Sequence, residues 1–177
     1  MPTPIFFLDT CILGAFLDLK KPNRESKECA NQLIAKLQGK KAYLVCPAIA
    51  KIELSKHSRV HHAKEAAGQR LCNLISEDFG KLTSAGIVVE PYFDISIAEQ
   101  AKFRSLFEYT LKNYAEHEIH LSDAFIASEA ALRNAIIVTF NEKDYNKAYK
   151  GYKVKWYNPL TKTMSEALRT DPLRKGI

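Results

Sequence analysis

Short apolar runs alternate with amphipathic stretches along most of this chain. Each run is rich in β-favouring residues and only a few residues long, which is typical of strands buried on both faces of a parallel sheet. The runs are Pro4–Leu8, Ala42–Cys46, Ile87–Val89 and Ala135–Thr139, and a fifth segment, Tyr152–Trp156, alternates as an edge strand would. The pattern predicts an α/β protein with a central, mainly parallel sheet of four to five strands.

The stretches between these runs have the spacing of helices. Leu121–Asn134 shows it best, because its apolar and small residues fall on one narrow face that can pack closely on a sheet. The other predicted helices are Thr10–Lys20, Arg24–Leu37, Ala48–His57, His61–Leu82 and Ile95–Tyr114.

The length of 177 residues predicts one domain, which we place at residues 1–159, followed by a C-terminal tail over 160–177 that is mobile from about Ser165. No apolar run approaches the ~20 residues that a bilayer requires, and the N-terminus lacks the features of a signal peptide. We therefore expect a cytoplasmic protein without membrane contact. The four cysteines are widely spaced and form no CxxC pair, which favours reduced thiols.

The formal net charge of +6 is compatible with a polyanionic partner such as RNA. Five Lys and Arg residues face only two glutamates between Lys51 and Arg70. Within this segment we take Lys51, Lys56 and Arg59 as candidate phosphate contacts. A solvated helix face is the alternative interpretation of such a run.

Acidic residues follow the predicted strands or lie in the first turns of the helices after them. Each has a purely structural interpretation: Asp9 as a helix N-cap, Glu53 as the partner of Lys56 or His57, and Asp123 as a complement to the dipole of a helix capped by Ser122.

Their common position favours a different interpretation. The carboxyl ends of parallel strands meet at one edge of the sheet, so Asp9, Glu53, Asp123 and the pair Asn141 and Asp144 are expected to converge there. Convergent carboxylates need a counter-charge, and an all-oxygen set suits Mg²⁺ or Mn²⁺. Such an ion supports hydrolysis of phosphodiester bonds.

Five ordered motifs resemble those of PIN domains, in particular the VapC-type ribonuclease toxins of prokaryotic toxin–antitoxin pairs. The similarity runs from about residue 4 to residue 159. The motifs are Phe7-Leu8-Asp9-Thr10, Ile52-Glu53-Leu54, Leu121–Ala127, Ile137–Tyr145 and Trp156-Tyr157-Asn158-Pro159.

The resemblance implies a three-layer α/β/α fold and a Mg²⁺- or Mn²⁺-dependent endoribonuclease. Asp9, Glu53 and Asp123 correspond to the first three acids of the family's metal site. The position two after Thr139 is Asn141 instead of an aspartate, which leaves Asp144 as the fourth acid. The resemblance also implies a homodimer that a cognate antitoxin neutralises.

Supporting roles are expected for three polar residues of these motifs. Thr10 and Thr139 would hold the site through hydroxyl hydrogen bonds, and Asn141 would act as a neutral ligand or position a water. Glu142 is expected to face solvent.

Three alternative functions are considered, and the sequence argues against the first. A haloacid-dehalogenase-like phosphatase would need Asp-x-Asp, whereas the second residue after Asp9 is Cys11. A catalytically weak PIN-like protein that binds or processes RNA is suggested by Asn141. An RNA-processing nuclease without an antitoxin is the third. The alternating acids and histidines of Glu116–His120 do not match a recognised metal-ligand spacing.

Overall fold

A computed structural model of the chain describes residues 3–19, 22–57, 77–89, 104–105, 108, 119–149, 154–168 and 170–173, except for the side chains of residues 55–57 and 147–149. No helix in these ranges is long and apolar enough to cross a membrane.

Six strands form one sheet in the order β3-β2-β1-β4-β5-β6. The first five strands are parallel, and β6 runs antiparallel to β5. Their bounds are β1 Ile5–Leu8, β2 Tyr43–Cys46, β3 Ile87–Val89, β4 Ile136–Val138, β5 Lys155–Asn158 and β6 Thr163–Met164. The central strand β1 is the most deeply buried, with Phe6, Phe7 and Leu8 all at 0% exposure.

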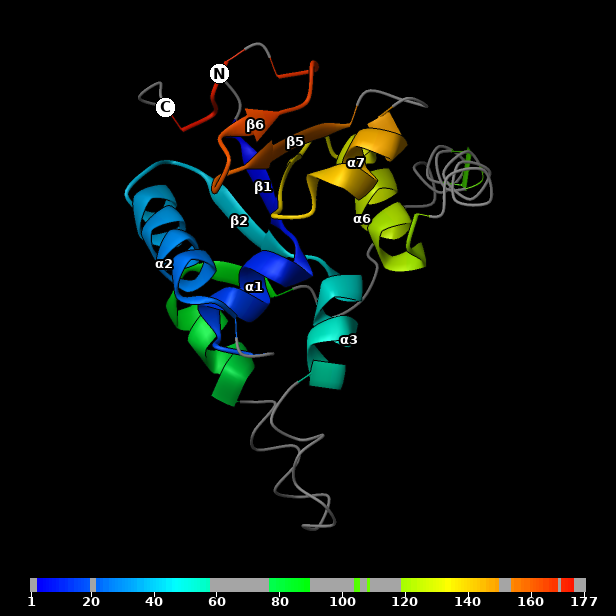
Figure 1. The fold of residues 1–177 in the computed structure, drawn as a ribbon. Coiled ribbons are helices and arrows are strands. Elements are labelled where there is room, and N and C mark those ends of the chain that lie inside the picture. The colour runs from blue at the N-terminus through cyan, green and yellow to red at the C-terminus, as the bar shows by residue number, and fades with distance from the viewer. Residues whose placement is uncertain are drawn as a thin grey trace.

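The helices follow from the direction in which the chain crosses the sheet. From β1 the chain moves to β2 and β3 on one side, and later returns past them to β4 and β5 on the other. Because parallel crossovers are right-handed, these two directions place the connecting helices on opposite faces of the sheet. Figure 1 shows α1 and α2 lying apart from α6 and α7, with strands between them. The helices are α1 Thr10–Phe16, α2 Arg24–Gln38, α3 Ala48–His57, α6 Leu121–Leu132 and α7 Glu142–Tyr149, and residues 77–84 are also helical.

The helix α6 packs as its sequence predicts. Ala124, Ala127 and Ala130 are all at 0% exposure, because small side chains let a helix approach the sheet closely. The helix α3 contacts both α1 and α6. It therefore connects helices that pack on opposite faces of the sheet.

The predicted α/β class and mainly parallel sheet are confirmed, but the number of strands differs. The sixth strand, β6, comes from the predicted tail, and β5 is therefore internal instead of an edge strand. Part of this segment packs on the domain where it is described: Ser165 is buried and Leu173 belongs to the hydrophobic core. The burial of these apolar and hydroxyl groups, together with the pairing of β6 with β5, is the physical reason that the described part of this segment packs on the sheet. The assignment of one domain to residues 1–159 stays a prediction.

Two predicted helices fall mostly outside the described residues. Of His61–Leu82 the structure describes only residues 77–82, which are helical, and of Ile95–Tyr114 only residues 104, 105 and 108. The first predicted helix, Thr10–Lys20, is shorter than expected. It ends at Phe16, and Asp18 has a φ of 61°, which no α-helix can include.

Candidate active site

The site lies where the strand order reverses. The chain leaves β1 toward β2 and leaves β4 toward β5, so a crevice opens beyond the carboxyl ends of the adjacent strands β1 and β4. Asp9 follows β1 directly, and Thr139 follows β4. The Thr139 hydroxyl donates to Oδ2 of Asp9 at 2.6 Å, which joins the two strand ends.

Asp9 is held by several donors. Its Oδ1 accepts from the backbone N–H of Thr10 at 2.7 Å, and Asp9 is the N-cap of α1. Its Oδ2 also accepts from the thiol of Cys11 at 3.2 Å. The interpretation of Asp9 as a helix cap is therefore correct, but it does not compete with a role in the site, because the same carboxylate also lines a cavity.

This cavity has a volume of about 350 Å³ and receives carboxylates from three separate elements. Asp9 comes from the β1–α1 junction, Glu53 from α3 and Asp123 from α6. Thr10, Cys11 and Asn141 add polar groups to its wall, and the other lining residues are Gly14, Ala15, Leu19, Pro22, Ser26 and Phe140.

Glu53 is half-buried and is bound to the element that carries Asp9. The hydroxyl of Thr10 donates to Oε2 of Glu53 at 2.5 Å, so Thr10 contacts one acid through its backbone and another through its side chain. The alternative partners of Glu53, the side chains of Lys56 and His57, lie outside the described residues.

Asp123 occupies the first turn of α6 and is only 7% exposed. The N-cap of this helix is His120, so the expectation that Ser122 caps it is wrong. Burial, with the carboxylates of Asp9, Asp144 and Glu53 nearby, raises the pKa of Asp123 to about 8. Oδ1 of Asp123 accepts a hydrogen bond of 3.4 Å from the hydroxyl of Tyr145.

Asp144 is near the cavity but does not line it. Its Oδ2 accepts from Nδ2 of Asn141 at 2.7 Å, and the backbone N–H of Asn141 donates to the hydroxyl of Thr139 at 2.8 Å. Asp144 is still close enough for its charge to raise the pKa of Asp123. The structure therefore brings Asn141 to the cavity wall and Asp144 to a position beside it.

The acids of the cavity have no basic partner within the described ranges. The ion pairs found there involve none of Asp9, Glu53 and Asp123. Burial raises the pKa of Asp9, and the charge of Glu53 adds to that effect. Buried carboxylates without a cation are costly, and a hard divalent cation would compensate them.

The donor set fits Mg²⁺ or Mn²⁺ in its chemistry, since it consists of carboxylate, hydroxyl and amide oxygens. The described carboxylates, however, do not surround a common position for an ion. In the part of the chain that the structure describes, no three Asp, Glu, His or Cys residues converge closely enough to hold an ion. Each of the four acids is held by a neighbouring side chain: Asp9 by Thr139 and Cys11, Glu53 by Thr10, Asp123 by Tyr145 and Asp144 by Asn141.

The sequence pattern missed two residues of this site. Cys11 contacts Asp9 and accepts from the backbone N–H of Phe140 at 3.2 Å, and burial raises its pKa well above the ordinary thiol value. Tyr145 is wholly buried and contacts Asp123. Cys11 is two residues after Asp9, and Tyr145 directly follows Asp144. This proximity to predicted acids is the only indication of their role that the sequence offers.

Glu142 does not simply face solvent as expected. Its Oε2 accepts from Asn158 and Thr161, each at 3.3 Å, and from the hydroxyl of Thr163. Glu142 therefore joins the start of α7 to the turn between β5 and β6. It does not line the cavity.

The candidate phosphate contacts lie mostly outside the described residues, which include neither the side chain of Lys56 nor Arg59. Nζ of Lys51 lies 5.5 Å from the centroid of the Phe79 ring, and Lys51 does not line the cavity.

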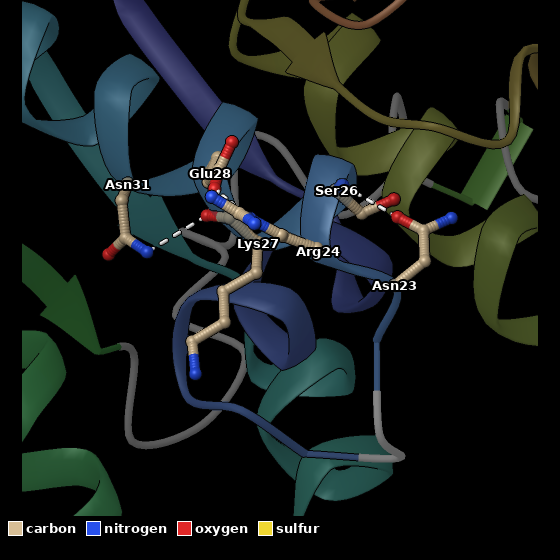
Figure 2. A network of polar contacts seen from close by, with 6 residues as sticks. All are labelled: Asn23, Arg24, Ser26, Lys27, Glu28 and Asn31. Carbon is tan, nitrogen blue, oxygen red and sulfur yellow. Dashed lines mark hydrogen bonds and ion pairs between the residues drawn. The ribbon is translucent and has the colours of Figure 1, made fainter.

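The N-terminus of α2 reaches the cavity through Ser26. Figure 2 shows how this turn is held: Oδ1 of Asn23 accepts from the backbone N–H of Ser26 at 2.7 Å, and Arg24 pairs with Glu28. The Arg24 charge is thus partly compensated by Glu28, although both members of the pair are exposed.

Solved structures share this fold. VapBC-1 from nontypeable Haemophilus influenzae has a TM-score of 0.57 and 18% identity over 88% of this chain and 98% of that one. VapBC2 from Rickettsia felis, bound to a DNA fragment from their promoter, has a TM-score of 0.60 and 19% identity over 87% and 98% of the two chains. FitAcB from Neisseria gonorrhoeae has a TM-score of 0.52 and 19% identity over 87% and 97%.

No protein-family model and no curated protein matches the sequence. At identities of 18% and 19%, the similarity to solved structures concerns the fold. The mainly parallel sheet, the helices that surround it and the extent of the match agree with the motifs read from the sequence. The chain has the PIN-like fold that its sequence motifs implied.

Proposed function

We propose that this protein is a Mg²⁺- or Mn²⁺-dependent endoribonuclease and the toxin of a type II toxin–antitoxin pair. The observation that carries the proposal is the cavity beyond β1 and β4. Carboxylates of three separate elements line it, and within the described ranges none of them forms an ion pair. A fold of this size has no structural need for such a cluster, because burial without a counter-charge opposes folding.

Asp9, Glu53 and Asp123 are the residues that we assign to the metal, with Asp144 as the fourth acid. When bound, the metal would supply a nucleophile from water and compensate charge on the phosphodiester. Thr139 and Cys11 fix the carboxylate of Asp9, and Thr10 holds Glu53. The side-chain amide of Asn141 donates to Oδ2 of Asp144 and fixes that carboxylate beside the cavity.

The assignment of a partner rests on the neighbours in fold. These neighbours are VapBC-1, VapBC2 and FitAcB, and the match covers almost the whole of each matched chain. Together with the sequence motifs, this supports a small antitoxin as the partner of this chain. A homodimer and a cytoplasmic location belong to the same proposal.

The test uses the purified full chain and a labelled single-stranded RNA. We expect cleavage with Mg²⁺ or Mn²⁺, none with EDTA, and recovery when Mn²⁺ is restored. Expression in cells should arrest growth. Cleavage that persists in EDTA would contradict metal dependence, and RNA binding without cleavage at any metal concentration would favour the catalytically weak RNA-binding alternative.

A further inference from the structure

Tyr145 is a wholly buried tyrosine whose hydroxyl contacts Asp123. It lies on α7 at 0% exposure, and its hydroxyl is 3.4 Å from Oδ1 of Asp123. A buried phenol requires a hydrogen-bond partner. In the described part of the chain, that partner is Asp123.

The two buried acids of the cavity are held very differently. Asp9 accepts from a backbone N–H, from the hydroxyl of Thr139 and from the thiol of Cys11. For Asp123, the described residues supply one donor, the hydroxyl of Tyr145. Three hydrogen bonds therefore orient the carboxylate of Asp9. Within the described residues, a single contact orients that of Asp123.

We propose that Tyr145 is the positioning residue of Asp123. Its hydroxyl donates to Oδ1, holds the carboxylate in one orientation and leaves Oδ2 for the divalent cation. This inference rests on the proposed function in assigning the cation, but the positioning itself is a property of the protein alone. Loss of a group that orients a metal ligand in this way typically weakens metal affinity or activity by about 10- to 100-fold.

The position of Tyr145 suits this role. The helix α7 packs on both α6 and β5, so the ring is fixed by its surroundings. The neighbouring Asp144 is anchored by Asn141 on the loop that follows β4. A simple packing role for the ring is the competing explanation, and Tyr145→Phe separates the two because it keeps the ring and removes only the hydroxyl.

The first measurement requires no metal. Crystal structures of the metal-free wild type and of Tyr145→Phe should show one Asp123 rotamer in the wild type and a displaced or divided carboxylate in the variant. An identical Asp123 position in both structures would overturn the positioning role.

The second measurement is the binding of Mn²⁺ to the full-length protein by titration calorimetry, without RNA. Tyr145→Phe should weaken binding by about tenfold, with the melting temperature recorded in parallel. Tyr157→Phe is the matched control, since Tyr157 is also buried but lies on β5. Its affinity for Mn²⁺ should equal that of the wild type.

Equal affinity of Tyr145→Phe and wild type would overturn the inference, as would an equal loss in both tyrosine variants. A wild type that binds no Mn²⁺ would instead overturn the proposed function, and the pair of metal-free structures would then decide the positioning role by itself.

Discussion

Asp123 is the residue whose surroundings have the strongest effect on its chemistry. Its pKa of about 8 is raised first by burial and then by the charges of Asp9, Asp144 and Glu53. Between the unfolded value of 3.8 and this folded value, the folded protein retains a proton that the unfolded chain has lost. Unfolding then releases a proton, so the free energy of unfolding falls as the pH rises through this interval.

This reasoning predicts the pH dependence of stability without metal. In EDTA, the melting temperature of the wild type should fall between about pH 5 and about pH 8, and Asp123→Asn should reduce this fall because its amide does not titrate. Thermal melts of both proteins across this range measure the effect. Parallel curves for wild type and variant would contradict it.

Cys11 carries a second prediction at this scale. Cys11→Ala removes a donor to Asp9 and the acceptor of the Phe140 N–H, so it should lower the free energy of unfolding by about 1–3 kcal/mol. Cys11→Ser, which can donate and accept, should lose less. Urea denaturation of both variants, with Cys29→Ala on α2 as the control, would detect this. An alanine variant as stable as the wild type would argue against the contacts.

Asp9, Asp123 and Asp144 could be predicted from the sequence because each follows a strand or lies in the first turn of a helix, whereas Glu53 lies one turn further into α3. Cys11 and Tyr145 could not, because their contacts depend on distant partners. The thiol of Cys11 meets the backbone of Phe140, and the phenol of Tyr145 meets a carboxylate on a different helix. Neither contact leaves a periodic signal.

At the scale of elements, the main difference from the prediction is β6. It has only two residues, too few to show alternation, and it follows a turn in which Oδ1 of Asn158 accepts from the backbone of Leu160 and Thr161. This turn follows β5, which ends at Asn158. The return of the chain along that strand depends on pairing that the polar sequence does not indicate.

The C-terminal segment therefore contributes to stability. Leu173 is buried in the core, and its carbonyl accepts from Nζ of Lys40 at 3.1 Å. We expect Leu173→Ala to lower the free energy of unfolding by about 2 kcal/mol. The exposed Thr170→Ala, three residues away, is the control for chemical denaturation. A mobile tail, as the sequence suggested, would leave both variants as stable as the wild type.

At the scale of the whole molecule, the strand order determines the site. The alternation of strands and helices predicted a parallel sheet with acids at one edge, and three of those acids do share a cavity. The sequence did not indicate which strands are neighbours, because that order depends on contacts between distant segments. The adjacency of β1 and β4 is what joins Asp9 to Thr139.

The central claim is that the acids of this cavity serve catalysis. The most direct measurement compares RNA cleavage by the wild type, Asp123→Asn and Glu142→Gln at saturating Mn²⁺, with a melting curve for each protein. Glu142 is the control because its carboxylate contacts Asn158, Thr161 and Thr163 and is assigned no role in the site, although its variant should melt earlier through the loss of these contacts. Asp123→Asn should lose cleavage by about a hundredfold or more, because a negatively charged ligand of the proposed metal ion is removed.

Asp123→Asn should also melt at or above the wild-type temperature in EDTA, since the repulsion among the acids is relieved. Glu142→Gln should retain most of its activity. A folded Asp123→Asn protein that cleaves RNA as fast as the wild type would contradict the account.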